Sequence, residues 1–462
     1  MAIFIHGGRL VSAVDSFDAS ILVEDGRIAA VGQDLDPPPG AEICDASGKL
    51  VLPGVVDVHV HVGLELRGHR SSGFEETTRE AALGGVTTFL TYAHPEPGES
   101  LVDVVERRRR EAEGRACIDY GLHAALVRWN EREDDEILAL IESGIPSFKA
   151  YTAYSDAGLR SDDEELYRAL LLTGQNDAIV EVHCENEWMI DMRARRAVEE
   201  NRLSAIDHAR SRPGYVEGEA VAAVLRAAYD AGAPVYIVHV SSGEGIEAIG
   251  EALDLGVEVY CETCPQFLLL DEDLLTRPDG HRYATCPPLR TAPHREAVWE
   301  GLEDGLVSAV ATDHCAFAAA EKDAGAEDFR KIPMGLPGVG TLLPLMWHFG
   351  VGGGRMSENE LVDRLSTNPC EIFGLHPAKG SLAVGTDADL VIFDPDLERT
   401  ISPALIGGHA DYTAYDGWET RGWPVSTMVR GAWVVKDRQL VGSLDHGRFV
   451  PRGKACRRPG RR

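Results

Sequence analysis

The sequence has few basic residues and no long apolar stretch. Lys and Arg number 45 against 75 Asp and Glu, which gives a formal net charge of −30. A chain of that sign does not favour the phosphate backbone, so we exclude general nucleic-acid binding. No window approaches the roughly 18 apolar residues of a membrane helix, and we expect no membrane partner.

Cysteine is also sparse. There are nine in 462 residues, without the paired spacing of a disulfide framework. The lone C-x-x-C of Cys261 and Cys264 lacks the second pair of a structural zinc site. The N-terminus lacks the basic start and apolar run of a secretory signal. We therefore expect a cytoplasmic protein with reduced thiols.

Positive charge gathers at one place, the C-terminal end of the chain. From Arg452 to Arg462 six of the eleven residues are Lys or Arg and none is acidic. A run of like charges is typical of a solvated tail. We predict that residues 451–462 are disordered or lie at a subunit contact.

The two ends of the chain contain short apolar or alternating segments separated by turn residues. Residues 20–23 and 27–31 flank Asp25-Gly26, a hairpin signal. Residues 389–393 and 432–435 have the same character. We predict that residues 1–52 and 377–450 together form one small β-sandwich domain.

The middle of the chain, residues 53–376, alternates apolar segments with amphipathic ones. Near-continuous apolar strands alternating with helices indicate a parallel sheet covered by helices. Eight such units predict an α/β fold, a (β/α)8 TIM-type barrel. A doubly wound open sheet is the alternative, although no G-x-G-x-x-G follows the first strand. The expected strands are 55–61, 86–92, 118–126, 147–151, 178–183, 235–240, 257–261 and 306–312.

Polar residues of one chemical kind occur at the ends of five of these strands. A (β/α)8 barrel builds its site from the C-terminal ends of its strands, so these side chains should converge on one rim. Two histidines separated by one residue on a strand point to the same face. Each residue alone has an ordinary structural explanation, but together they predict a metal centre. The candidates are His59, His61, Lys149, His183, His239 and Asp313.

Lys149 interrupts an apolar strand and would therefore be buried beside cations. Burial and neighbouring positive charge both lower the pKa of a lysine. The residue is then either neutral or modified to carry a negative charge, and its position in the sequence leaves both open.

Several motifs resemble those of the cyclic amidohydrolases, most of all the hydantoinase/dihydropyrimidinase branch. The resemblance covers nearly the whole chain in the same order. The motifs are Gly54-Val-Val-Asp-Val-His-Val-His61, Phe148-Lys-Ala-Tyr-Thr-Ala-Tyr154, Glu181-Val-His-Cys-Glu-Asn186, Val238-His-Val-Ser-Ser242, Glu262-Thr-Cys-Pro-Gln266, Cys286-Pro-Pro-Leu-Arg290 and Ala311-Thr-Asp-His-Cys315.

The resemblance implies a binuclear, usually zinc, centre. His59, His61 and Asp313 would hold the more buried metal ion and His183 and His239 the other, with Lys149, carboxylated on its Nζ, as the bridge. It also implies hydrolysis of a cyclic amide, a hydantoin or dihydropyrimidine-type ring, to an N-carbamoyl amino acid by a metal-bridging hydroxide.

Two further roles follow from the same resemblance. Tyr154 would stabilise the oxyanion, and Asp313 would carry the proton to the leaving nitrogen.

Three positions depart from the usual pattern of that family. Cys286 stands where Ser is usual, Met334 where Asn is usual and Gly340 where Glu is common. Tyr154, Cys286 and Met334 are the candidate substrate-binding residues, and the resemblance implies that the ring amide is contacted at Cys286 and Met334 largely through the backbone. Met334 would make the pocket wall more apolar.

Other features bear on the substrate and on competing functions. Gly63 occupies the position where dihydroorotase commonly has a carboxylate-binding Arg. A small neutral cyclic amide or ureide is therefore the expected substrate, and allantoinase is an alternative. A non-catalytic assembly protein and a one-metal hydrolase or deaminase are alternatives of other classes. Relatives are commonly tetramers or dimers, so we expect a homo-oligomer.

Overall fold

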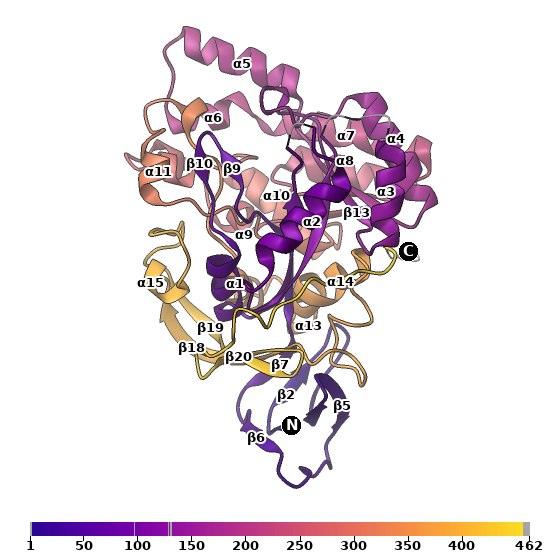
Figure 1. Ribbon diagram of the computed structural model, residues 1–462. Coiled ribbons are helices and arrows are strands. Elements are labelled where there is room, and N and C mark those ends of the chain that lie inside the picture. Colours follow the sequence, from indigo (N-terminus) through magenta and orange to yellow (C-terminus); the bar gives the residue numbers. More distant parts are fainter. Residues whose placement is uncertain (1, 97, 128, 130–131, 456–462) are drawn as a thin grey trace.

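The computed structural model describes residues 2–96, 98–127, 129 and 132–455 (Figure 1). Its central sheet has eight strands in the order β17-β16-β15-β14-β13-β12-β11-β8, and every neighbouring pair within it is parallel. The strands are β8 (Val55–Val60), β11 (Val86–Ala93), β12 (Asp119–Ala125), β13 (Ser147–Tyr151), β14 (Ile179–His183), β15 (Val235–Ile237), β16 (Val259–Thr263) and β17 (Ala309–Val310).

The first and last strands of this sheet meet where the chain leaves β17. Val60 forms a parallel bridge with His314, and the His61 N–H donates to the His314 carbonyl oxygen at 2.7 Å. The sheet therefore closes on itself, which confirms the predicted (β/α)8 barrel and excludes the open doubly wound sheet.

Helices surround the barrel because the strands are buried and the apolar side chains on their outer face need cover from water. All residues of β8, β11 and β12 are buried. No helix of the described ranges is both long and apolar enough to cross a bilayer. The helices are α1 (Phe74–Leu83), α2 (Leu101–Ala112), α3 (Glu133–Glu142), α4 (Asp163–Gln175), α5 (Glu187–Glu199), α6 (Ala205–Ser211), α7 (Gly214–Ala231), α8 (Gly243–Asp254), α9 (Pro265–Leu269), α10 (Ala292–Glu303), α11 (Ala319–Asp323), α12 (Leu342–Leu345), α13 (Glu358–Val362), α14 (Asn368–Ile372) and α15 (Pro403–Ile406).

A second β unit lies at one end of the barrel and combines strands from the N-terminal and C-terminal parts of the chain, as predicted (Figure 1). Its larger sheet has seven strands in the order β21-β20-β19-β18-β7-β2-β3, and its smaller sheet the order β5-β4-β1-β6. Ile3 and Ile21 of the smaller sheet share one core with Val51 and Ile392 of the larger. The strands are β1 (Ile3–His6), β2 (Arg9–Val11), β3 (Ser16–Asp18), β4 (Ser20–Glu24), β5 (Arg27–Gly32), β6 (Glu42–Asp45), β7 (Leu50–Pro53), β18 (Leu390–Thr400), β19 (Glu419–Val429), β20 (Ala432–Lys436) and β21 (Gln439–Leu440), with a separate hairpin of β9 (Glu65–Leu66) and β10 (His69–Arg70).

A buried ionic cluster joins the barrel to this second unit. Lys379, 1% exposed, donates to Asp119 of β12 at 2.9 Å and to Asp389, just before β18, at 2.5 Å. Arg430, just after β19, adds a contact of 3.0 Å to Asp119. Asp387 also lies 3.5 Å from the Lys379 ammonium. The cluster thus holds three carboxylates and two cations, and each charge has an opposite partner, as buried charges require.

The start of the basic tail is packed against the barrel and is not solvated as a run of like charges suggests. Arg452 is 5% exposed, its guanidinium donates to Ser147 Oγ at 2.7 Å and to the Leu122 carbonyl, and its N–H donates to the Gly144 carbonyl. Oxygen atoms at this end of the barrel accept from its terminal nitrogens, which a run of basic residues does not reveal. Residues 456–462 lie outside the described residues.

We predict that Lys379→Met lowers the free energy of unfolding by about 3–5 kcal/mol, because two buried carboxylates then lose their shared cation. Urea denaturation followed by far-UV circular dichroism measures the change. Lys436→Met is the matched control, since its ion pair with Glu42 is partly exposed and such pairs contribute at most about 1 kcal/mol. Equal losses in the two variants would contradict the assigned role of the cluster.

Candidate metal centre

The candidate residues meet at the C-terminal rim of the barrel. His59 lies on β8, Lys149 on β13 and His183 at the end of β14. His239 and Asp313 follow β15 and β17, and His61 follows β8 directly. The alternation of strand side chains turns His59 and His61 to the same side, where their rings lie 5.2 Å apart between centroids.

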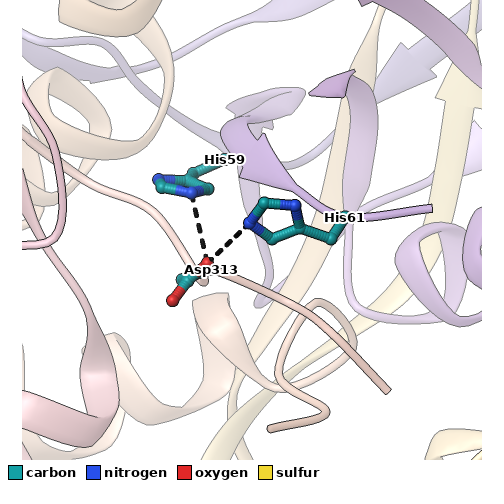
Figure 2. A group of neighbouring side chains, drawn as sticks. All are labelled: His59, His61 and Asp313. Atoms are coloured by element: carbon teal, nitrogen blue, oxygen red, sulfur yellow. Dashed lines mark ion pairs between the residues drawn. The ribbon is translucent and has the colours of Figure 1, made fainter. Parts of the chain in front are cut away.

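One carboxylate oxygen brings two of the histidines together. Asp313 Oδ1 lies 3.1 Å from His59 Nε2 and 3.1 Å from His61 Nε2 (Figure 2). The donor atoms of the three residues all lie within 4.8 Å of one another. Two imidazole nitrogens and a carboxylate oxygen at this spacing are a donor set that suits zinc and similar divalent ions.

The other two histidines form a second group beside the first. His183 Nδ1 lies 2.8 Å from His239 Nε2, and the ring of His239 lies 5.4 Å from that of His59. On its other side, His183 Nε2 lies 2.8 Å from Glu185 Oε2. Because a carboxylate only accepts hydrogen bonds, the proton of His183 lies on Nε2 and Nδ1 keeps its lone pair for a metal.

Lys149 lies among these groups with an unsatisfied ammonium. The residue is 1% exposed, and its Nζ has no hydrogen-bond partner within the described parts of the chain. The nitrogen lies 5.1 Å from the centroid of the Tyr92 ring, which also contacts His59 and His61. Burial lowers the pKa of Lys149. A buried nitrogen without an acceptor is costly, and a group or ion that satisfies it is needed.

The charge balance of the centre also suits cations. Burial favours the neutral imidazole of His59, but the carboxylates of Glu262 and Asp313 outweigh it and raise the pKa of His59 to about 9. The Asp313 carboxylate is ionised, because His59 and His61 hold its pKa well below the usual range in spite of burial. The residues present therefore fit a metal centre.

Three residues of the rim have strained backbones. Tyr154 has φ 76°, Asp313 has φ 50° and His239 has φ 41°. Non-glycine residues seldom adopt this left-handed region, and such strain concentrates at functional sites. All three residues follow the C-terminal ends of barrel strands, β13, β15 and β17.

Sequence reasoning missed the carboxylates that hold the candidate ligands in place. Glu262 of β16 contacts His59 Nδ1, accepts from the Tyr236 hydroxyl at 2.9 Å and accepts from the His239 N–H at 3.3 Å. Glu181 accepts from the Tyr92 hydroxyl at 3.3 Å. Carboxylates in this position fix the ring orientation of metal-binding histidines. The available signal was an acidic residue inside an otherwise apolar strand.

Tyr154 lies at the same rim beside the second pair of histidines. Its ring centroid is 4.8 Å from that of His183, and its hydroxyl donates to Glu185 Oε2 at 3.4 Å. Arg212 binds the same oxygen at 2.5 Å. Burial raises the pKa of Tyr154 well above its usual value, so the hydroxyl keeps its proton and can donate it in a hydrogen bond.

Cys286 adjoins Tyr154. Its Sγ lies 3.6 Å from His208 Nε2. Burial raises the pKa of Cys286 against the opposing effects of Arg212 and of a hydrogen bond with Tyr154. The thiol is therefore neutral, which favours a small pocket-lining residue over a reactive one. Met334 lies on a separate loop and is partly exposed.

The third departure from the family pattern, Gly340, has a structural explanation. A Cβ built on Gly340 would lie 2.8 Å from Cγ of Glu80, and the Gly340 N–H donates to Glu80 Oε1 at 3.4 Å. Glu80 comes from α1 and is 1% exposed. A glutamate side chain thus still lies beside position 340, but it belongs to Glu80 of α1 and not to residue 340 itself.

Comparisons with known proteins agree with this architecture. Residues 50–434 match the model of the amidohydrolase family. The chain is 39% identical to a D-hydantoinase of Geobacillus stearothermophilus, with 98% of this chain and 97% of that protein covered. A crystal structure of dihydropyrimidinase from Brevibacillus agri superimposes with a TM-score of 0.97 at 36% identity, covering 99% of this chain and 100% of that one. The chain therefore belongs to the amidohydrolase family, in its hydantoinase/dihydropyrimidinase branch.

Proposed function

We propose that this protein hydrolyses the amide bond of a neutral cyclic amide, a hydantoin or dihydropyrimidine-type ring, to an N-carbamoyl amino acid. The observation that carries the proposal is the convergence of His59, His61 and Asp313 within 4.8 Å beside the His183–His239 pair. The relatives named D-hydantoinase and dihydropyrimidinase support this reaction class.

The donor atoms supply two metal subsites in this proposal. His59, His61 and Asp313 would hold one divalent ion, and His183 and His239 the other. Lys149, carboxylated on its unpartnered Nζ, would connect them, with zinc as the expected metal. Bound there, the ions would polarise a carbonyl group and lower the pKa of water.

Two side chains of the protein would take part in the reaction, Asp313 in proton transfer and Tyr154 in stabilising the negative charge on the carbonyl oxygen. Asp313 presents Oδ1 to the two imidazoles, which leaves Oδ2 to accept a proton from the attacking water. The same oxygen would return this proton to the ring nitrogen as the C–N bond breaks. The Tyr154 hydroxyl would donate a hydrogen bond to the carbonyl oxygen as negative charge develops on it.

The walls of the pocket favour an uncharged ring. Cys286 is a neutral thiol beside Tyr154, and Met334 is a flexible apolar side chain. Arg212, the cation beside Tyr154, is already paired with Glu185. We also propose a homo-oligomer, supported by Trp188 of α5, an aromatic side chain that is 70% exposed.

A parallel assay tests the proposed function. We expect the metal-loaded protein to open at least one of hydantoin, dihydrouracil, a 5-aryl hydantoin and allantoin, with about two equivalents of divalent metal per chain. Product formation measured by liquid chromatography and metal content measured by plasma mass spectrometry give the answer. Metal-loaded protein that opens none of the four rings would refute the reaction class, and turnover of allantoin alone would favour the allantoinase alternative.

We predict that Lys149→Ala lowers the metal content from two equivalents to one or fewer and reduces kcat/KM about 10²–10³-fold, because the connecting ligand and its charge are lost. Lys331→Ala, which removes an exposed lysine, is the control and should leave both values unchanged. A fully active Lys149→Ala protein with one metal would favour a one-metal hydrolase instead.

We predict that Tyr154→Phe lowers kcat by about 10²–10³-fold, the usual effect of removing one oxyanion donor. Metal content should not change, since the tyrosine hydroxyl is not among the proposed ligands. Steady-state kinetics together with metal analysis measure both quantities. Tyr229→Phe, at a tyrosine that is 54% exposed, serves as the control; a Tyr154→Phe variant as active as this control would remove Tyr154 from the mechanism.

A further inference from the structure

Besides Lys149 and Lys379, a third lysine, Lys322, is buried. Lys322 of α11 is 0% exposed, yet its Nζ donates to three backbone carbonyl oxygens. The distances are 2.7 Å to Ala284, 2.9 Å to Pro333 and 2.9 Å to Gly335. The three protons of an ammonium thus have three acceptors, and all of the acceptors are main-chain groups.

These carbonyls belong to the two segments that carry the candidate substrate-binding residues. Ala284 precedes Cys286 by two positions, and Pro333 and Gly335 flank Met334. Ala284, Pro333 and Gly335 are buried, whereas Cys286 and Met334 are partly exposed. The ammonium therefore holds main-chain groups next to both candidate residues, which are themselves partly exposed.

The segments are also fixed to each other and to the end of the last barrel strand. The Gly335 N–H donates to the Ala284 carbonyl at 3.1 Å, and the Cys315 N–H donates to the Leu336 carbonyl at 2.9 Å. A Cβ built on Gly335, whose φ is 137°, would lie 2.6 Å from Cβ of Cys315. Since Cys315 follows Asp313 by two residues, a shift of this loop alters its distance from the metal centre.

Burying a lysine at this position costs more free energy than burying an apolar residue there would. Burial lowers its pKa to about 7, and a charge removed from water is tolerated only when its hydrogen bonds are satisfied. Here the hydrogen bonds of the ammonium offset the free-energy cost of its burial, and they orient three peptide groups at once. A hydrogen bond from a charged donor is stronger than one from a neutral donor. A methionine would fill the volume but would remove a donor from all three carbonyls, and within the described residues only that of Ala284 would keep another, the Gly335 N–H.

We propose that Lys322 is a positioning residue for substrate recognition. Its ammonium sets the spacing between the segment of Cys286 and the loop of Met334, and this spacing fixes the positions of the main-chain groups that contact the ring amide. The inference rests on the proposed function, because it assumes that a cyclic amide binds between these two segments. It assigns Lys322 no part in the chemical step and no contact with the metal ligands.

The test compares Lys322→Met, which loses all three donors, with Lys322→Gln, which keeps a two-proton donor. We expect KM to rise about tenfold in the methionine variant and less in the glutamine variant, in line with the loss of hydrogen bonds that orient the site. The value of kcat and the metal content should stay close to wild type. Hydantoin and a 5-aryl hydantoin are the substrates, and KM should rise by the same factor for both, because they share the ring amide.

The controls separate positioning from general destabilisation. Lys331→Met, at an exposed lysine nine residues along the chain, should leave KM unchanged, and thermal melting reports the stability of every variant. Wild-type KM in a folded, metal-loaded Lys322→Met protein would overturn the inference, as would a fall in kcat alone. If Lys322→Met does not fold, wild-type KM in Lys322→Gln overturns it. Wild-type protein that opens no cyclic amide would instead refute the proposed function itself.

Discussion

The closure of the barrel between its first and last strands is the constraint on which the rest of this structure depends. The contact of Asp313 Oδ1 with His59 and His61 exists only because the chain after β17 lies against the end of β8, where His61 bonds to the His314 carbonyl. Closure therefore builds the rim and the donor set at once. A sheet left open at this seam would separate Asp313 from both imidazoles, although every strand remained intact.

The interior beneath the rim is polar, and two of its buried glutamates each contact a histidine and a tyrosine. Glu262 contacts His59 and Tyr236, and Glu181 contacts His123 and Tyr92. Such groups are costly to bury singly, but a fully connected network is rigid. Rigidity of this kind keeps ligand atoms in place before any ion arrives, which limits the reorganisation that binding requires.

Much of the fold and part of the candidate site could be predicted from the sequence, and the reason lies in periodicity. Strand alternation placed His59 and His61 on one face, and the parallel arrangement brought the strand ends to one rim. The supporting groups were not predictable, because the partners of Glu262 and Lys322 come from distant segments whose register only the folded chain defines. Arg452 is a further example. Its charge suggested that it is exposed, but it is buried and donates to a carbonyl oxygen of the barrel, a partner that lies far away in the sequence.

The burial of Arg452 bears on the order in which the protein is made. Its guanidinium reaches Leu122, 330 residues earlier in the chain, and β18 pairs with β7 across nearly the same span. In each contact the later partner, Arg452 or β18, is synthesised after all eight strands of the barrel. The barrel strands are thus made before the segments that complete these long-range contacts, and contacts of such high sequence separation form slowly.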